Sequence, residues 1–126
     1  MNNYWKTTAW PTLEITTSIP KAGCVVDCVF CPQRVLQKVW DAEKFTTNAA
    51  RTMKLEDFKM VIDKLPKEVR ITFSGFTEPW LNKNTTDMLL YAHEQGHRVS
   101  VFTTAVGMQL KDVERIKDIP FCGGPN

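Results

Sequence analysis

The chain has 126 residues, of which 16 are Lys or Arg and 14 are Asp or Glu, so its net charge is +2. At this length we expect a single domain, 1–126, and a hydrophobic share of 43% is enough to build its core. Because charges of both signs are interspersed, the composition gives no basis for binding to nucleic acid or to an anionic membrane.

The N-terminal stretch MNNYWKTTAW lacks the basic and then apolar order of a signal peptide. No run of about 18 apolar residues follows, so we expect no membrane span. The sequence therefore predicts a cytoplasmic protein. In that reducing environment its four cysteines are expected to serve as metal ligands or redox thiols rather than as disulfides.

The first third of the chain predicts one strand followed by two helices. LEITTSI at 13–19 is short and β-branched, as expected of a strand, and the loop GCVVDCVFCP at 23–32 follows it. Pro32 suits the first turn of a helix, in which apolar residues at 35–40 share one face. A second helix is predicted over 55–65, where apolar residues again recur at helical spacing.

The rest of the chain continues this alternation. VRITFS at 69–74 predicts a second strand, and a helix that ends at Gly96 follows it. HRVSVFT at 97–103 predicts a third strand, and 110–116 a short last helix.

Strands separated by helices predict an α/β fold with a parallel sheet of about three βα units and right-handed connections. In such sheets the functional loops leave the carboxyl ends of the strands. Here those loops are 23–32, 74–80 and 103–108. All three are therefore expected on one rim of the sheet.

The first of these loops carries three cysteines, Cys24, Cys28 and Cys31. Structural zinc takes four ligands, usually as two separated pairs, and no second pair follows downstream. A 4Fe–4S cluster normally uses four cysteines, one for each iron. Three cysteines would leave one iron open, and an open position distinguishes a catalytic metal site from a structural one.

The pattern C-x-x-x-C-x-x-C, with Phe30 directly before its last cysteine, resembles that of the radical S-adenosylmethionine (radical SAM) enzymes. The resemblance implies that Cys24, Cys28 and Cys31 hold three irons of a 4Fe–4S cluster, while S-adenosylmethionine chelates the fourth. It further implies reductive cleavage of that cofactor to a 5′-deoxyadenosyl radical, which abstracts hydrogen from a substrate that the sequence does not identify. Phe30 would pack near the adenine.

The second loop, SGFTEPW at 74–80, resembles the family's glycine-rich segment that ends in Glu-Pro. Gly75 would let the backbone approach the cofactor closely. Backbone carbonyls and the Glu78 carboxylate would accept hydrogen bonds from the methionyl ammonium. Thr77 stands where many members have glycine.

The third loop is similar to the family's Thr-Asn-Gly segment, with Thr103-Thr104-Ala105 in its place. The resemblance implies that the Thr104 hydroxyl contacts the cofactor.

The resemblance covers the first half of a core that typically has six βα units, so we expect an incomplete (β/α)6, TIM-like partial barrel. Such a half leaves its third strand with an open edge and exposes apolar helix faces. We therefore expect either a truncated gene product or a chain that a second chain or self-association completes. By family analogy, a flavodoxin or ferredoxin would be the electron donor.

The residues leave other interpretations open. A non-catalytic metal-binding domain, with zinc or an iron–sulfur cluster, would serve structure or electron transfer. Zinc could recruit Cys122, His93 or His97 as its fourth ligand, although surface histidines and an incidental Cys122 are the commoner explanation. The C-x-x-C pair of Cys28 and Cys31 could be a redox dithiol, and three buried thiols are a further alternative.

Overall fold

The computed structural model describes residues 11–19, 24, 26–43, 52–75 and 77–121. Three parallel strands form one sheet in the order β1-β2-β3. They are β1 (Thr12–Ile15), β2 (Arg70–Phe73) and β3 (Val99–Val101). The predicted α/β fold with a parallel sheet is confirmed, but each strand is shorter than its sequence pattern suggested. β1 ends at Ile15, opposite Phe73, and Ser18 instead makes an isolated antiparallel bridge with Thr52.

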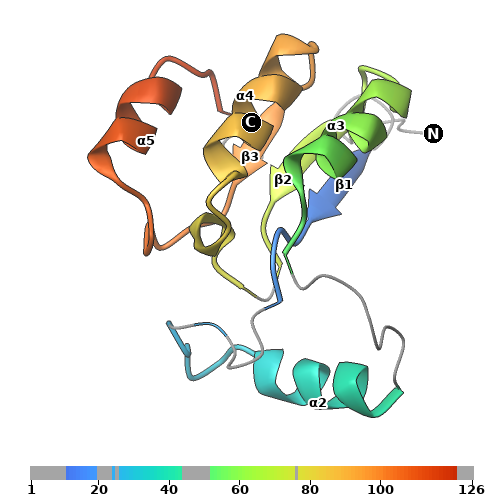
Figure 1. Cartoon of the computed structure of the whole chain (residues 1–126), viewed down its shortest axis with the longest axis vertical. Coiled ribbons are helices and arrows are strands. Elements are labelled where there is room, and N and C mark those ends of the chain that lie inside the picture. The colour runs from blue at the N-terminus through green and yellow to red at the C-terminus, as the bar shows by residue number, and fades with distance from the viewer. Residues whose placement is uncertain (1–10, 20–23, 25, 44–51, 76, 122–126) are drawn as a thin grey trace, which may run out of the picture.

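The predicted helices are present, and one short 3-10 turn lies between β2 and the helix that follows it. These elements are α2 (Gln33–Glu43), α3 (Leu55–Lys64), η1 (Pro79–Leu81), α4 (Thr85–Glu94) and α5 (Leu110–Ile116). In Figure 1, α3 and α4 lie side by side against the sheet, and α5 lies beyond α4. α2 lies apart from them, past the carboxyl ends of the strands. None of the helices in the described ranges is long and apolar enough to cross a membrane.

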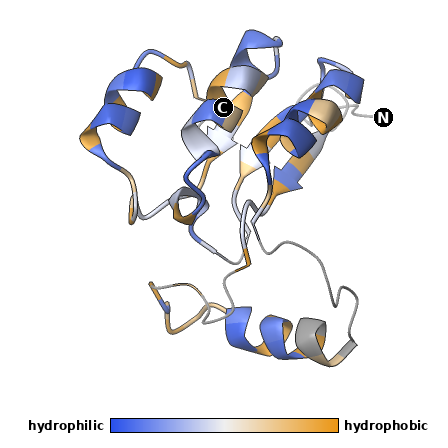
Figure 2. Ribbon diagram, viewed as in Figure 1, coloured by the Kyte–Doolittle hydropathy of each residue, from blue (hydrophilic) through white to orange (hydrophobic). Residues whose placement is uncertain are grey.

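The core lies between the sheet and the helices α3 and α4. Its fully buried apolar side chains come from all of these elements: Phe58, Ile62, Ile71, Phe73, Met88, Leu89, Ala92 and Val99. The rings of Phe58 and Phe73 meet with their centroids 5.7 Å apart. Figure 2 shows the apolar residues on the inward sides of these elements. Each fully buried side chain of this size contributes about 1.5–3 kcal/mol, so packing of α3 and α4 fixes the strands that carry the rim loops.

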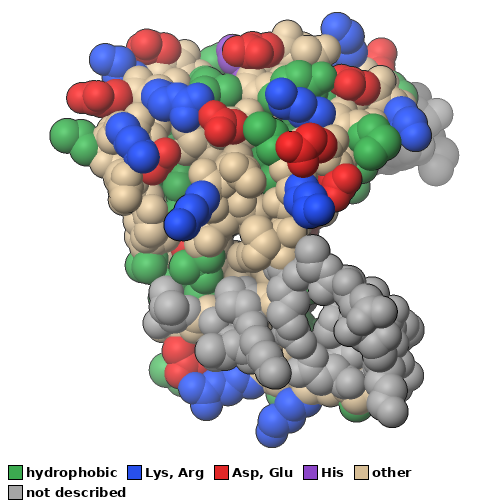
Figure 3. Space-filling view, viewed as in Figure 1, with side chains coloured by type: hydrophobic (Ala, Val, Ile, Leu, Met, Phe, Trp, Pro, Cys, Tyr) green, Lys and Arg blue, Asp and Glu red, His purple; other side chains and the backbone are tan. Residues whose placement is uncertain are grey.

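The apolar side chains of α2 do not join this core. Val35 is 65% exposed and Val39 is 52% exposed, and Leu36 is exposed as well. Val35, Leu36 and Val39 of the predicted apolar face are therefore exposed and do not pack in the sheet's core. On the face shown in Figure 3, Lys and Arg side chains alternate with Asp and Glu over the part built on the sheet.

The sheet face opposite α3 and α4 is polar. In the strand register Glu14 lies beside Thr72, and Thr72 lies beside Ser100. The hydroxyls of Thr72 and Ser100 are buried and 2.6 Å apart. Within the described residues β3 pairs only with β2, so the sheet has the open third-strand edge that the sequence predicted.

Asn82 ties the rim together just after η1. Its Nδ2 donates to the carbonyl oxygens of Thr17 (2.9 Å) and Met53 (3.0 Å), and its Oδ1 accepts from the backbone N–H of Asn84 (2.9 Å). The residue is only 1% exposed. One buried amide thus joins the chain after β1, the chain before α3 and the turn into α4.

Replacing Asn82 with Ala is expected to lower the free energy of unfolding by about 2–4 kcal/mol, because it leaves buried polar groups without partners. Urea unfolding followed by circular dichroism measures this loss. The matched control is Asn84→Ala, since the Asn84 side chain makes no capping hydrogen bond and is half-buried. We expect that variant to lose less than about 1 kcal/mol; equal losses in both would contradict the assignment.

Candidate functional site

A cavity of about 380 Å³ lies where the three rim loops meet. This volume lies within the range of about 300–1,000 Å³ that is typical of small-molecule sites. All eight residues that the sequence selected line it: Cys24, Cys28, Phe30, Cys31, Gly75, Thr77, Glu78 and Thr104. The structure therefore brings together three segments that are far apart in the sequence. Their contacts with a cofactor remain predictions.

Two consecutive backbone turns shape the cysteine loop. The N–H of Asp27 donates to the carbonyl of Cys24 (3.2 Å), and that of Cys31 donates to the carbonyl of Cys28 (3.0 Å). Asp27 has a φ of 47°, in the left-handed region that Asp tolerates better than most residues. The three thiols are free of disulfides and half-buried. The turns therefore present all three to the same cavity.

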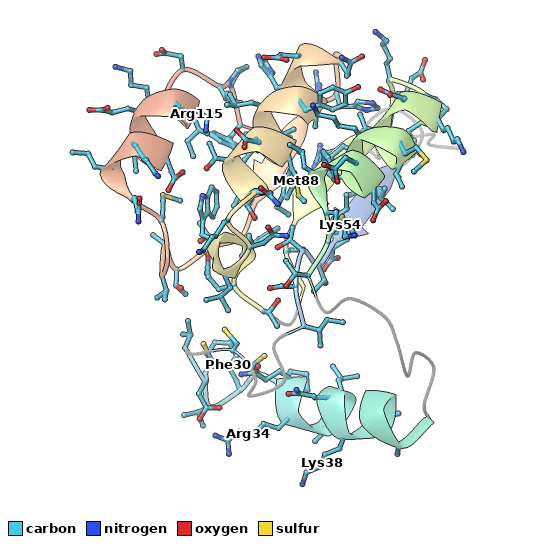
Figure 4. The ribbon with its side chains drawn as sticks, in the orientation of Figure 1. Phe30, Arg34, Lys38, Lys54, Met88 and Arg115 are labelled. Carbon is cyan, nitrogen blue, oxygen red and sulfur yellow. The ribbon has the colours of Figure 1, made fainter. Side chains whose placement is uncertain are left out.

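The first turn of α2 contacts the cysteine loop. Arg34 forms an ion pair with Asp27 across the loop, but this pair is exposed and contributes about 0–1 kcal/mol. Figure 4 shows Phe30 in the loop, and Arg34 and Lys38 pointing away from the sheet. The ring of Phe30 is 90% exposed and still lines the cavity, so it is open to a ligand there.

The sequence analysis missed Gln33, the first residue of α2. It is 5% exposed, it lines the cavity, and its Oε1 accepts a hydrogen bond of 2.6 Å from the backbone N–H of Cys24. The sequence offered one signal for it, a polar residue directly after Cys31-Pro32, where a predicted helix begins. That signal is common at helix starts and does not reveal a buried side chain.

The ligand chemistry of the three cysteines is compatible with a 4Fe–4S cluster. Cys24, Cys28 and Cys31 line one cavity, and in such a cluster each thiolate binds a different iron. Among the described residues, no group of three His, Cys, Asp or Glu side chains is placed to hold a single metal ion.

The histidines lie elsewhere. His97 is 3% exposed, and its Nδ1 lies 2.8 Å from the carbonyl oxygen of Val69, at the amino ends of β2 and β3. The expectation of a surface histidine is therefore wrong for His97. Its ring is buried at the amino ends of the strands, opposite the rim loops. His93 is exposed on α4. Neither residue lines the cavity, and Cys122 lies outside the described residues.

Gly75 lies at the end of β2 with a φ of +107°. A Cβ atom there would lie 1.9 Å from the Thr16 Oγ1. Glycine is therefore required here by the close approach of Thr16, directly after β1, while the predicted approach of Gly75 to a cofactor stays a prediction. Thr77, two residues later, donates its hydroxyl to the carbonyl of Ser18 at 2.5 Å. Both residues thus hold the second loop against the end of β1.

Glu78 joins the second loop to the third. Its carboxylate is buried, and it accepts hydrogen bonds from the hydroxyl of Thr103 and from the N–H and hydroxyl of Thr104 at 2.8 and 2.9 Å. The N–H of Trp80 adds a longer contact of 3.4 Å. The side chain of Trp80 belongs to the core, where its Nε1 donates to Thr86. Both carboxylate oxygens therefore hold the rim in place.

Replacing Gly75 with Ala is expected to destabilise the protein by more than about 2 kcal/mol, because a steric clash adds to an unfavourable φ. The double variant Gly75→Ala/Thr16→Ala should recover part of this loss, since it removes the clash and leaves the strain. Denaturant unfolding of the two single variants and the double variant measures the coupling. Fully additive losses would show that Thr16 is not the obstacle.

Both the sequence and the structure were compared with those of known proteins. The sequence model of the Radical SAM superfamily matches residues 18–123. Among solved structures, the chain is similar to the crystal structure of BtrN in complex with AdoMet and 2-DOIA, with a TM-score of 0.53 and 16% sequence identity. The match covers 89% of this chain and 43% of that one, so this chain spans less than half of the BtrN chain. At this identity the likeness concerns the fold, a partial barrel. No curated protein matches the sequence.

Proposed function

The chain belongs to the radical SAM superfamily, and on that premise we propose that Cys24, Cys28 and Cys31 hold a 4Fe–4S cluster whose fourth iron is left open for S-adenosylmethionine. The observation that carries this proposal is that one cavity is lined by all three cysteines and by residues of both other rim loops. When bound, such a cluster supplies the electron that cleaves S-adenosylmethionine to methionine and a 5′-deoxyadenosyl radical, which abstracts hydrogen from a substrate.

The protein's own residues would bind and orient the cofactor. Three thiolates would leave one iron of a 4Fe–4S cluster without a protein ligand, and an exchangeable ligand needs such an open position. Phe30 offers an exposed aromatic face to the adenine. The rim of Gly75, Glu78 and Thr104 offers carbonyl, carboxylate and hydroxyl oxygens to the methionyl ammonium.

Glu78 has two tasks in this proposal. A carboxylate has about four acceptor positions, and the two threonines and Trp80 engage both of its oxygens. These contacts are four in number, so an ammonium group would have to replace one of them, and the 3.4 Å contact with the N–H of Trp80 is the longest. Because Thr103 and Thr104 already fix the carboxylate, it needs little reorganisation to accept a cation.

The proposal includes two kinds of partner, further βα structure and an electron donor. The three βα units correspond to less than half of the BtrN chain, so the substrate pocket needs further structure along the open edge of β3. We assign that role to further βα units, from a second chain or a second copy. A flavodoxin or ferredoxin would deliver the electron.

The proposal is tested by anaerobic reconstitution with iron and sulfide, followed by reduction with dithionite in the presence of S-adenosylmethionine. We expect about four irons per chain and the formation of 5′-deoxyadenosine, measured by liquid chromatography. A protein that binds zinc stoichiometrically and takes up no cluster would contradict it. A cluster that forms without any 5′-deoxyadenosine would instead support a non-catalytic electron-transfer domain.

A further inference from the structure

Gln33 is the buried polar side chain of the cavity whose hydrogen-bonding capacity is only half used. Its Oε1 accepts from the backbone N–H of Cys24. That contact fixes the orientation of the amide, because only the oxygen can accept. The Nε2 group, with two N–H donors, has no hydrogen-bond partner among the described residues.

The position of Gln33 places this unused donor beside the three cysteines. The side chain is 95% buried and lines the same cavity as Cys24, Cys28 and Cys31. Among the described residues, the fully buried side-chain atoms that lack a partner are Ser18 Oγ and Arg70 Nε, so the Nε2 of Gln33 keeps some accessible surface and is free to donate to a ligand.

We propose that Gln33 is a positioning and tuning residue for the cluster, an inference that rests on the proposed function. Its carbonyl oxygen anchors the backbone of Cys24, and its amide N–H groups donate toward the sulfur atoms of the bound cluster. Hydrogen bonds to cluster sulfurs stabilise the added electron and raise the reduction potential. The N-terminus of the 11-residue helix α2 begins at Gln33 and acts in the same direction.

Two substitutions separate anchoring from tuning. Gln33→Glu keeps an oxygen that can accept from Cys24 and replaces the donor with an acceptor. Gln33→Met keeps the length of the side chain and removes both functions. Gln37→Glu is the matched control, because it adds the same charge one turn later on α2, at a residue that does not line the cavity.

The measurement is an EPR-monitored redox titration of each reconstituted protein at pH 8, together with its iron content. We expect both Gln33 variants to have midpoint potentials more negative than the wild type, and Gln37→Glu to stay near it. Gln33→Met should also retain less iron than Gln33→Glu, because it loses the Cys24 anchor.

Potentials of both Gln33 variants that match that of Gln37→Glu, with wild-type iron content, would overturn the inference and leave the proposed function intact. A wild-type chain that takes up no cluster at all would overturn both, so the two failures are distinguishable. A Gln33→Met chain that is folded by circular dichroism but holds no iron would support the anchoring role.

Discussion

Replacement of Cys24 with Ala is expected to abolish 5′-deoxyadenosine formation, reducing it to the level of the protein-free control. The reason is structural as well as chemical. Cys24 is one of three thiols that line the cavity, and Gln33 fixes its backbone by accepting from its N–H. With two thiolates, two irons of a cluster would lack protein ligands. Reconstitution should leave less iron bound, and the visible absorbance of the thiolate-bound cluster should be lost.

Cys122→Ala is the matched control for this experiment. It removes the one cysteine outside the loop, so it should leave both iron content and product formation near the wild-type values. If Cys122→Ala instead abolished metal binding, the zinc interpretation with Cys122 as fourth ligand would be favoured. Loss in Cys24→Ala but not in Cys122→Ala supports three cysteines and an open iron.

Glu78→Gln is expected to cost about 3 kcal/mol of unfolding free energy. Its carboxylate is 5% exposed and accepts hydrogen bonds from Thr103 and Thr104, and hydrogen bonds to a charged acceptor contribute about 1.5–3 kcal/mol each. In the Glu78→Gln variant an NH2 group would replace the oxygen that accepts from the N–H and hydroxyl of Thr104, so donors would face donors. We expect the third loop to separate from the second, and the affinity for S-adenosylmethionine to fall at least about tenfold, equivalent to about 1.4 kcal/mol.

Urea unfolding measures the first effect and isothermal titration with S-adenosylmethionine the second, under conditions in which the variant is folded. Glu94→Gln is the control, because Glu94 is exposed at the end of α4; its stability should change by less than about 0.5 kcal/mol. A Glu78→Gln protein with wild-type stability would show that the carboxylate does not join the loops. Wild-type affinity in a destabilised variant would restrict Glu78 to a structural role.

The sequence predicted the parts of the fold that depend on local pattern. Period-two and helical spacing located the three strands and the helices, and parallel topology then placed the loops after 13–19, 69–74 and 97–103 on one rim. That is why all eight selected residues line one cavity. The strands themselves are shorter than predicted, because pairing with a neighbour decides where each one ends.

The parts that escaped sequence reasoning depend on long-range contacts. Gln33, Asn82 and His97 are polar residues with no local pattern, and each is buried because a distant backbone group satisfies it. The use of both Glu78 oxygens by Thr103 and Thr104 is a contact across 25 and 26 residues. Spacing alone cannot show which of two carboxylate functions, ligand binding or loop joining, a buried glutamate serves.

The central claim is that three thiolates leave one iron of the cluster open to S-adenosylmethionine. The most direct measurement is the EPR spectrum of the reconstituted, dithionite-reduced protein with and without S-adenosylmethionine. We predict that the cofactor changes the g-values and line shape of the reduced cluster signal, because it becomes a ligand to the open iron. A cluster signal that is unchanged at saturating S-adenosylmethionine would contradict the claim.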